Sequence, residues 1–432
     1  MLRKSLSSLT LLVACVAPSL RAQDHWTFTH KFELRANYRD SHEEFLAIKA
    51  PFPVDFPEPG QSSVFLRTPD KGTHAELSVF NVQLDLGYGK WLGARAKVHF
   101  QDKYRRNPTS TDRKIDADEL FIRIGEKPEF LERTAGTSFF ALFGKAPKME
   151  RQPTRLLESY GLAATVFNRF EDVQVQVGGS IGRSLYWRLQ ASNGNPLFFR
   201  DANALAGDNG TPERVPPHPN PRIKSGFPIL YNAETEGLFF DTDHVQFGQG
   251  IGYRWQRDDE TMGFDVVAFH YRRKLAQEEK LTGTFYGGDL DLLDGAFGIS
   301  LPIHGDRKEE WGSRLYSEWH GGTLIAQFTK QHLAGLQRQA WEVESGYRIP
   351  LAFGPLEYVQ PTGRVSGLHN RYRAPVGFVA PSMFWQWKKV DAGVRIGFKR
   401  NIDVTIERAH HSISAAKKLD VSETLVTFRI KV

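Results

Sequence analysis

The sequence lacks the features on which membrane-spanning helices and most enzyme families depend. After the N-terminal segment, no run of apolar residues approaches the length of about 18 that a transmembrane helix needs. There is one cysteine, Cys15, which leaves the rest of the chain without thiol or disulfide chemistry. A glycine-rich phosphate loop and a His-Glu-x-x-His motif are both absent. We therefore expect no enzyme activity, no bound metal and no cofactor.

A large charge excess is also missing. The formal net charge of the 432 residues is +6, and without Arg3, Lys4 and Arg21 of the N-terminal segment it falls to +3. So small an excess does not indicate a nucleic-acid partner. What the chain has instead is glycine and aromatic residues, with 38 Gly, 31 Phe, 13 Tyr and 9 Trp, a load that is unusual for a soluble helical enzyme.

The first 22 residues have the layout of an export signal. Arg3 and Lys4 precede an apolar stretch from Leu6 to Ala17, and Ala22 offers a small residue for cleavage. This predicts export through the Sec pathway and a mature chain that covers residues 23–432. One alternative stays open, because Leu12 to Cys15 resembles a lipoprotein box and would leave a lipidated Cys15 in place of a removed signal.

The mature chain shows apolar and polar residues in strict alternation. Trp26, Phe28, Phe32, Leu34, Ala36 and Tyr38 fall on even positions, and mostly polar residues fall between them. Similar segments recur along the chain, for example 80–88, 92–100, 245–255, 392–398 and 424–432. A soluble fold could not bury one common core behind so many strands with charged alternate residues. The pattern predicts an all-β, transmembrane, antiparallel up-and-down β-barrel with lipid-facing apolar residues and a polar lumen.

The connections between these segments also alternate, in length. Tight turns are predicted near 87–91, 180–183, 321–322 and 400–401, and long loops at 40–73, 146–170, 194–243 and 367–387. Short turns at one end and long loops at the other are typical of outer-membrane barrels. The count comes to about 16–18 strands, with an even total. Aromatic residues near strand ends, including Trp255 and Trp387, are expected to form the interfacial girdles.

Basic residues at the inward positions are the candidate pore lining. They are Lys31, Arg35, Arg39, Arg95, Lys97, Arg123, Arg188, Arg254, Arg348, Arg395 and Arg429. Acidic residues occupy inward positions as well: Glu33, Asp85, Glu119, Glu342, Glu344, Asp391, Asp403 and Glu407. The field of the basic groups would draw anions, whereas pairing with the acids would make a general pore of mixed charge.

Four short segments resemble the phosphate-selective porin O and P family. They are Asp118 to Arg123, Phe143 to Glu150, Tyr186 to Gly194, and Val390 to Val394 followed by Arg400-Asn401. The resemblance implies trimers that allow passive, often anion-preferring diffusion across the outer membrane. It also implies that the loop at 146–170 folds into the pore, with Lys148, Arg151 and Arg155 as constriction residues. Two departures are a final Val432 in place of phenylalanine, and the lack of a dense basic ladder.

The expected function is therefore that of an outer-membrane porin for small hydrophilic solutes, including anions such as phosphate. Outer-membrane lipid and the barrel-assembly machinery are its expected partners. Two alternatives remain. The chain could be a polysaccharide export channel of the alginate type, or a barrel that anchors surface loops or carries an enzyme site.

Overall fold

The computed structural model describes most of the predicted mature chain. The described residues are 25–41, 45–46, 66–67, 72–100, 115–128, 130–132, 136–168, 171–194, 238–240, 242–243, 245–274, 307–333, 336–371, 386–414 and 418–432. The predicted export signal and Cys15 lie outside them, so both expectations stay predictions. Among the described residues, no helix is long and apolar enough to cross a membrane.

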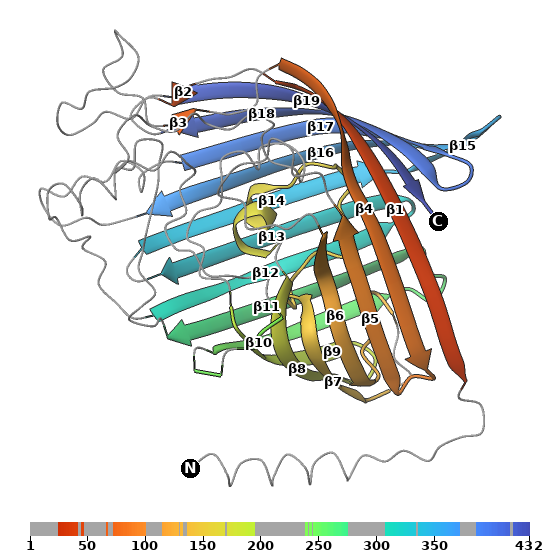
Figure 1. Cartoon of the computed structure of the whole chain (residues 1–432), viewed down its shortest axis with the longest axis vertical. Helices are drawn as coiled ribbons and strands as arrows, with labels where there is room; N and C mark the ends of the chain where they lie inside the picture. Colours follow the sequence, from red (N-terminus) through yellow and green to blue (C-terminus); the bar gives the residue numbers. More distant parts are fainter. Residues whose placement is uncertain are drawn as a thin grey trace, which may run out of the picture.

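The described chain forms sixteen long strands, one of which is interrupted and carries two labels, β14 and β15 (Figure 1). The strands are β1 (Trp26–Ser41), β4 (Gly72–Tyr88), β5 (Leu92–Phe100), β6 (Ile115–Gly125), β7 (Ser138–Pro147), β8 (Glu171–Ile181), β9 (Leu185–Ser192), β10 (Gln246–Gln256), β11 (Met262–Lys274), β12 (Arg307–Trp319), β13 (Gly322–Leu333), β14 (Leu336–Tyr347) with β15 (Ile349–Phe353), β16 (Leu356–Arg371), β17 (Gln386–Phe398), β18 (Ile402–Ser414) and β19 (Lys418–Lys431). A two-residue ladder joins β2 (Phe45–Leu46) to β3 (Leu66–Arg67), and Ala164–Asn168 form a short π-helix, η1.

Each strand pairs antiparallel with its neighbours in the chain, and the sheet closes on itself. The first strand, β1, pairs with β4 on one side, from Trp26 opposite Tyr88, and with the last strand, β19, on the other, where Arg35 lies opposite Arg429. Closure removes both sheet edges, so every strand can satisfy its backbone hydrogen bonds inside a membrane. The predicted fold class is confirmed, with an even strand total at the lower end of the predicted range.

The connections divide the barrel into a turn end and a loop end. Turns of two to five residues join strands at 89–91, 182–184, 257–261, 320–321, 354–355 and 399–401. At 399–401, Arg400 and Asn401 both have positive φ (68° and 57°), as a tight hairpin turn requires. At the loop end, strands extend two to five residues into the segments expected as loops at 40–73, 146–170 and 367–387, because their pairing continues there.

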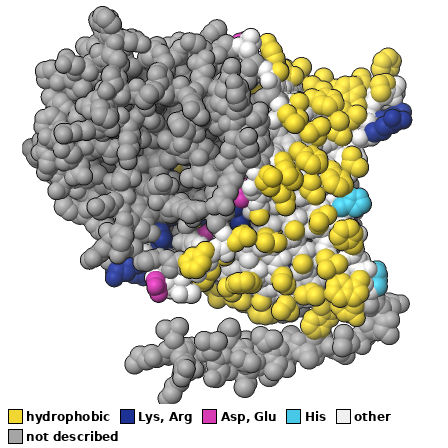
Figure 2. All heavy atoms as spheres, in the orientation of Figure 1, with side chains coloured by type: hydrophobic (Ala, Val, Ile, Leu, Met, Phe, Trp, Pro, Cys, Tyr) yellow, Lys and Arg dark blue, Asp and Glu magenta, His cyan; other side chains and the backbone are white. Residues whose placement is uncertain are grey.

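Side chains alternate between the two faces of the wall as predicted. On β1, Trp26 and Phe28 are 59% and 62% exposed on the exterior, while Arg39 is fully buried on the interior. Figure 2 shows hydrophobic side chains covering the described part of one side of the barrel. Trp387 is an exception to the predicted girdle: it is buried, and its Nε1 donates to His411 Nδ1 at 3.2 Å. The girdle assignment was wrong for Trp387, because β17 places odd-numbered residues inward at this level.

β-Bulges in β4 and β6 change which residues of these strands face inward. In β4, Ser78 is the extra residue between Leu77 and Val79. In β6, Asp118 is the extra residue between Ala117 and Glu119, so two successive carboxylates face the interior. The second bulge places Asp118 within 2.8 Å of Lys97 Nζ.

Candidate functional site

The loop between β7 and β8 lies inside the barrel, where Figure 1 shows it with η1 in the lumen. Its backbone is held by carboxylates of the opposite wall. The amides of Leu156 and Leu157 donate to Glu344 on β14 at 2.5 and 3.0 Å, and that of Ala164 donates to Glu342 at 3.0 Å. Inward acids of the wall therefore fix this segment, 148–168, which we call the internal loop.

A second group of contacts holds the tip of the internal loop. The amides of Glu158 and Ser159 donate to Glu407 on β18 at 3.0 and 3.1 Å. Arg364 on β16 donates to the Ser159 carbonyl at 2.8 Å and to Asp391 at 2.9 Å. All these groups are buried, and such charges are tolerated in a low-dielectric site only when they are paired and hydrogen-bonded, as they are here.

Glu158 joins the internal loop to three arginines of the wall. Its carboxylate lies 3.0 Å from Arg395, 2.9 Å from Arg429 and 3.7 Å from Arg35. Burial by itself would raise the pKa of Glu158, but the guanidinium groups of Arg429, Arg35 and Arg395 lower it to about 2. The side chain therefore stays ionised across the neutral range and offsets part of this basic cluster.

Lys148 is held by two carboxylates at the root of the internal loop. Its Nζ lies 2.9 Å from Glu150 and 2.6 Å from Glu310, and it donates to the Phe167 carbonyl at 3.1 Å. Burial alone would lower the pKa of Lys148, but the two carboxylates raise it above its ordinary value. Lys148 is 7% exposed, so most of its surface is used in these contacts.

The turn-end connection between β6 and β7 also enters the barrel. Leu131 from this connection packs in one buried apolar cluster with Leu156 of the internal loop and with Tyr316 and Ile325 of the wall. Phe130 beside it lies under the guanidinium of Arg314, 4.4 Å from ring centroid to carbon. On the β12–β13 side, the lumen is thus filled by the internal loop and the β6–β7 connection, which enter from opposite ends of the barrel.

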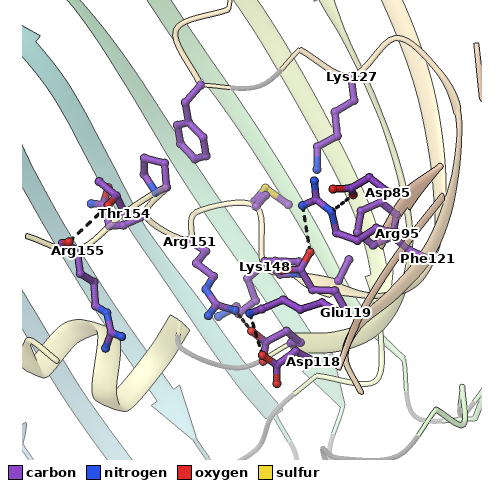
Figure 3. A pocket seen from close by; sticks show the side chains of 18 of the residues that line it. Asp85, Arg95, Asp118, Glu119, Phe121, Lys127, Lys148, Arg151, Thr154 and Arg155 are labelled. Atoms are coloured by element: carbon purple, nitrogen blue, oxygen red, sulfur yellow. Dashed lines mark hydrogen bonds and ion pairs between the residues drawn. The ribbon is translucent and has the colours of Figure 1, made fainter. Parts of the chain in front are cut away.

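A cavity of about 880 Å³ remains in the lumen. Its lining extends from Lys90 and Glu126 at the turn end to Asp116 and Glu171 toward the loop end. Figure 3 shows Asp85, Arg95 and Glu119 on one side of the pocket and Thr154 and Arg155 of the internal loop on the other. Among the described side chains that line the cavity, fifteen are basic and twelve are acidic. The lining is therefore strongly charged, with a small basic excess.

Most charges on the β4–β6 side of the cavity are paired. Arg95 lies 2.6 Å from Asp85 and 3.3 Å from Glu119, and Lys97 lies 2.8 Å from Asp118. On the β9–β12 side, by contrast, three basic residues, Arg188, Arg254 and Arg314, line the cavity beside one acidic residue, Asp265. Arg314 pairs with Asp265 at 2.8 Å, while Arg188 and Arg254 lie over the Tyr186 ring. This is where the basic excess of the lining is concentrated.

The structure brings most of the predicted site residues to the cavity. Arg35, Arg95, Lys97, Arg123, Lys148, Arg151 and Arg155 line it, and Lys31 and Arg39 do not. Arg151 is ion-paired with Glu171, and the Arg155 guanidinium lies 3.7 Å from the Tyr160 ring centroid. Arg348, between β14 and β15, is exposed and takes no part in the lining; its guanidinium lies 3.8 Å from the ring centroid of Tyr358. That any of the lining residues sets selectivity stays a prediction.

Sequence reasoning missed Arg314 and Arg364, which both line the cavity. They lie on β12 and β16, two strands whose alternation is masked by serine and glycine at outward positions such as Ser313 and Gly363. The usable signal was the apolar residues at odd positions of β12, Trp311, Leu315 and Trp319, which alternate with Arg314.

One short motif in the chain has a different meaning from the one its pattern suggests. Residues 178–182 match Gly-x-Ser-x-Gly, the turn that presents a nucleophilic serine in hydrolases. That function requires a sharp strand-to-helix turn, whereas Ser180 lies within β8, is buried, and is followed by a hairpin into β9. The match therefore does not define a catalytic site.

The fold and the lumen together define a class: a closed transmembrane β-barrel of sixteen strands, narrowed by an internal loop. No protein-family model matches the chain, and no curated protein sequence matches it. The resemblance to the phosphate-selective porin family therefore stays a prediction.

Solved structures with the same architecture do exist. The outer membrane channel DcaP of Acinetobacter baumannii is similar, with a TM-score of 0.52 and 10% identity over 96% of this chain and 99% of that chain. OprB of Pseudomonas putida is similar as well, with a TM-score of 0.51 and 10% identity over 94% of each chain. At this level of identity the likeness shows the fold.

Proposed function

We propose that the chain is an outer-membrane porin through which small hydrophilic solutes diffuse passively. The observation that carries this proposal is the charged cavity of about 880 Å³ that extends between the two ends of a closed barrel. The similarity to an outer membrane channel supports the localisation. No reaction is part of the proposal.

The same lining supports a weak preference for anions. Basic side chains exceed acidic ones by three, and Arg188, Arg254 and Arg314 concentrate that excess on one wall. A field of this kind favours entry of anions without a dedicated binding site. Phosphate is one such anion, and assembly into trimers belongs to the same proposal.

The alternatives are less well supported by this lumen. An extended polysaccharide needs an open passage, whereas the internal loop is fixed across the lumen by Glu342, Glu344 and Glu407. A barrel that serves as an anchor for surface loops has no need of a charged cavity reaching both ends.

Planar bilayers test the proposal directly. We expect the folded full chain to give stepwise current, and its reversal potential in a potassium chloride gradient to show weak anion preference. The double variant R123Q/R155Q removes two lining charges and should shift the reversal potential toward cations. Arg155 is more informative than Lys148, whose loss would remove the cation that two buried carboxylates, Glu150 and Glu310, share.

The matched control is R257Q/R348Q, which removes two arginines outside the cavity lining and should leave the reversal potential unchanged. Absence of current steps from a barrel that is folded by gel mobility would refute the porin proposal. Equal shifts in both variants would refute the assignment of Arg123 and Arg155.

A further inference from the structure

The exterior of the barrel carries a belt of basic side chains toward the loop end of β11–β18. Arg272 on β11, Lys388 on β17 and Arg408 on β18 are exposed, and Lys330 on β13 is partly exposed. Each alternates along its strand with a buried inward residue, so each points away from the lumen. We refer to these four residues as the basic belt.

The belt lies at the outer border of the apolar band. On β12, Trp319 at the turn end and Trp311 nearer the loop end both face outward, as the tryptophans of two interfacial girdles would. Lys330 Nζ lies 5.2 Å from the Trp311 ring centroid, and His332 stacks on the same ring at 5.7 Å. Arg272 lies opposite Glu309, two residues further toward the loop end than Trp311. This is the depth at which lipid headgroups begin.

The acids that face the belt already have partners of their own. Glu309 lies 3.0 Å from His270, and Asp420 lies 2.9 Å from Lys418. A hydrogen bond to an imidazole leaves Glu309 charged, so it offsets part of the charge of Arg272, which lies directly opposite it. Among the described carboxylates, none forms an ion pair with Lys330, Lys388 or Arg408, which supply the positive excess of the belt. The excess positive charge faces the lipid rather than the lumen.

On the opposite side of the barrel, the described part of the strands shows no such belt. On β4, β5, β6 and β10, the described outward positions nearest the loop end hold uncharged side chains: Ala75, Leu77, Val98, Phe100, Ile115 and Phe247. Phe247 is 66% exposed. If the charges served only to keep the rim of the barrel hydrated, they would be spread around the whole circumference. Their place on one side therefore indicates a surface that binds a ligand.

We propose that the basic belt binds the phosphate groups of an anionic glycolipid in the loop-end leaflet of the membrane. Arg272 and Arg408 offer planar forks that match phosphate oxygens, and Lys330 and Lys388 add point charges. A soluble anion is a poor occupant, because the sites lie on the lipid-facing exterior and not in the cavity. The proposal rests on the outer-membrane location proposed above.

The test uses the folded full chain in detergent and lipid A as the probe. Binding is measured by native mass spectrometry for lipid A with both phosphates, for its dephosphorylated form and for phosphatidylglycerol. We expect the variant R272Q/K330Q/K388Q/R408Q to bind phosphorylated lipid A at least about tenfold more weakly than the unaltered chain. The control R257Q/R348Q/K399Q/R400Q removes four basic residues at the turn end and should bind as the unaltered chain does.

Three results would overturn the proposal: unchanged binding by the belt variant, an equal loss in the control, or equal binding of dephosphorylated lipid A. Preference for phosphatidylglycerol would likewise show that the belt recognises general anionic lipid. If the fourfold variant does not fold, K388Q/R408Q repeats the test with a smaller expected loss. Channel current measured on the same preparations separates the porin proposal from the lipid proposal. A barrel that conducts but does not bind lipid A refutes the lipid proposal and leaves the porin proposal standing.

Discussion

Glu158 shows how single residues determine the shape of the lumen. It lies at the tip of the internal loop, and its carboxylate is shared by Arg395 and Arg429, with Arg35 slightly further away. Without that carboxylate, Arg395 and Arg429 would share only Asp403 as a partner in a buried space. The ionisation of Glu158 therefore helps to hold the tip of the loop, together with the wall carboxylates that accept from the loop amides.

Acid should loosen the internal loop through Glu158. Because its pKa in the folded chain, about 2, is below the ordinary value of 4.5, its stabilising contribution is complete above pH 4.5 and is lost as the pH falls toward 2. The contribution is on the order of 3 kcal/mol. We expect single-channel current to become noisy over this range, and E158Q to show the same noise at neutral pH. D259N, at an exposed turn, is the control and should behave as the unaltered chain does. If the noise does not change with pH in either E158Q or the unaltered chain, the assignment to Glu158 is wrong.

At the scale of elements, the lumen is shaped by two connections rather than by the strands. The internal loop enters from the loop end and the β6–β7 connection from the turn end, and they meet at Leu156 and Leu131. Gly125 is where the second of these leaves the wall. Its φ of +85° is in the region that favours glycine, and a Cβ there would press against the carbonyl oxygen of Phe139.

Replacement of Gly125 should therefore damage the barrel locally. We expect G125A to lower the free energy of unfolding by about 1–3 kcal/mol, because both the backbone conformation and the β6–β7 pairing are disturbed. The temperature at which the folded form is lost on a gel measures the effect. G136A is the matched control, since a Cβ at Gly136 would meet open space; an equal loss in the two variants would argue against the role of Gly125.

At the scale of the whole molecule, the barrel has its polar groups inside and its apolar groups outside. Ile122 and Ile124 on β6 are each 54% exposed, while Arg364, Lys389 and Glu407 are buried in the interior. The hydrophobic effect therefore stabilises this chain mainly through contact with lipid.

A charge placed on the lipid face should be costly. We expect L120R, at the middle residue of β6, to destabilise the barrel in lipid by about 2–4 kcal/mol, since an arginine near the bilayer midplane has no polar partner. Urea titration of the barrel in vesicles measures it. F239R provides the control, because Phe239 is 77% exposed but lies outside the strands; comparable losses would mean that the exterior of β6 is not in contact with lipid.

Alternation in the sequence was sufficient to predict the barrel and most of its lining. A strand with period two has one face for lipid and one for water, so Trp26 and Arg35 were assigned to the correct faces without any coordinates. Trp387 was assigned to the girdle from its place near a strand end, but β17 turns its odd-numbered residues inward. Arg314 and Arg364 were missed, because their strands have serine and glycine where apolar residues were expected.

The sequence by itself thus determined the all-β class, the even strand total and the mixed charge of the lumen, since all three follow from local patterns. The tertiary structure decided which charges remain available to solutes. The pairing of Glu344 and Glu407 with loop amides, and the meeting of Leu131 with Leu156, join residues that lie far apart in the chain. Local patterns carry no information on such contacts, because their geometry exists only after the barrel has closed.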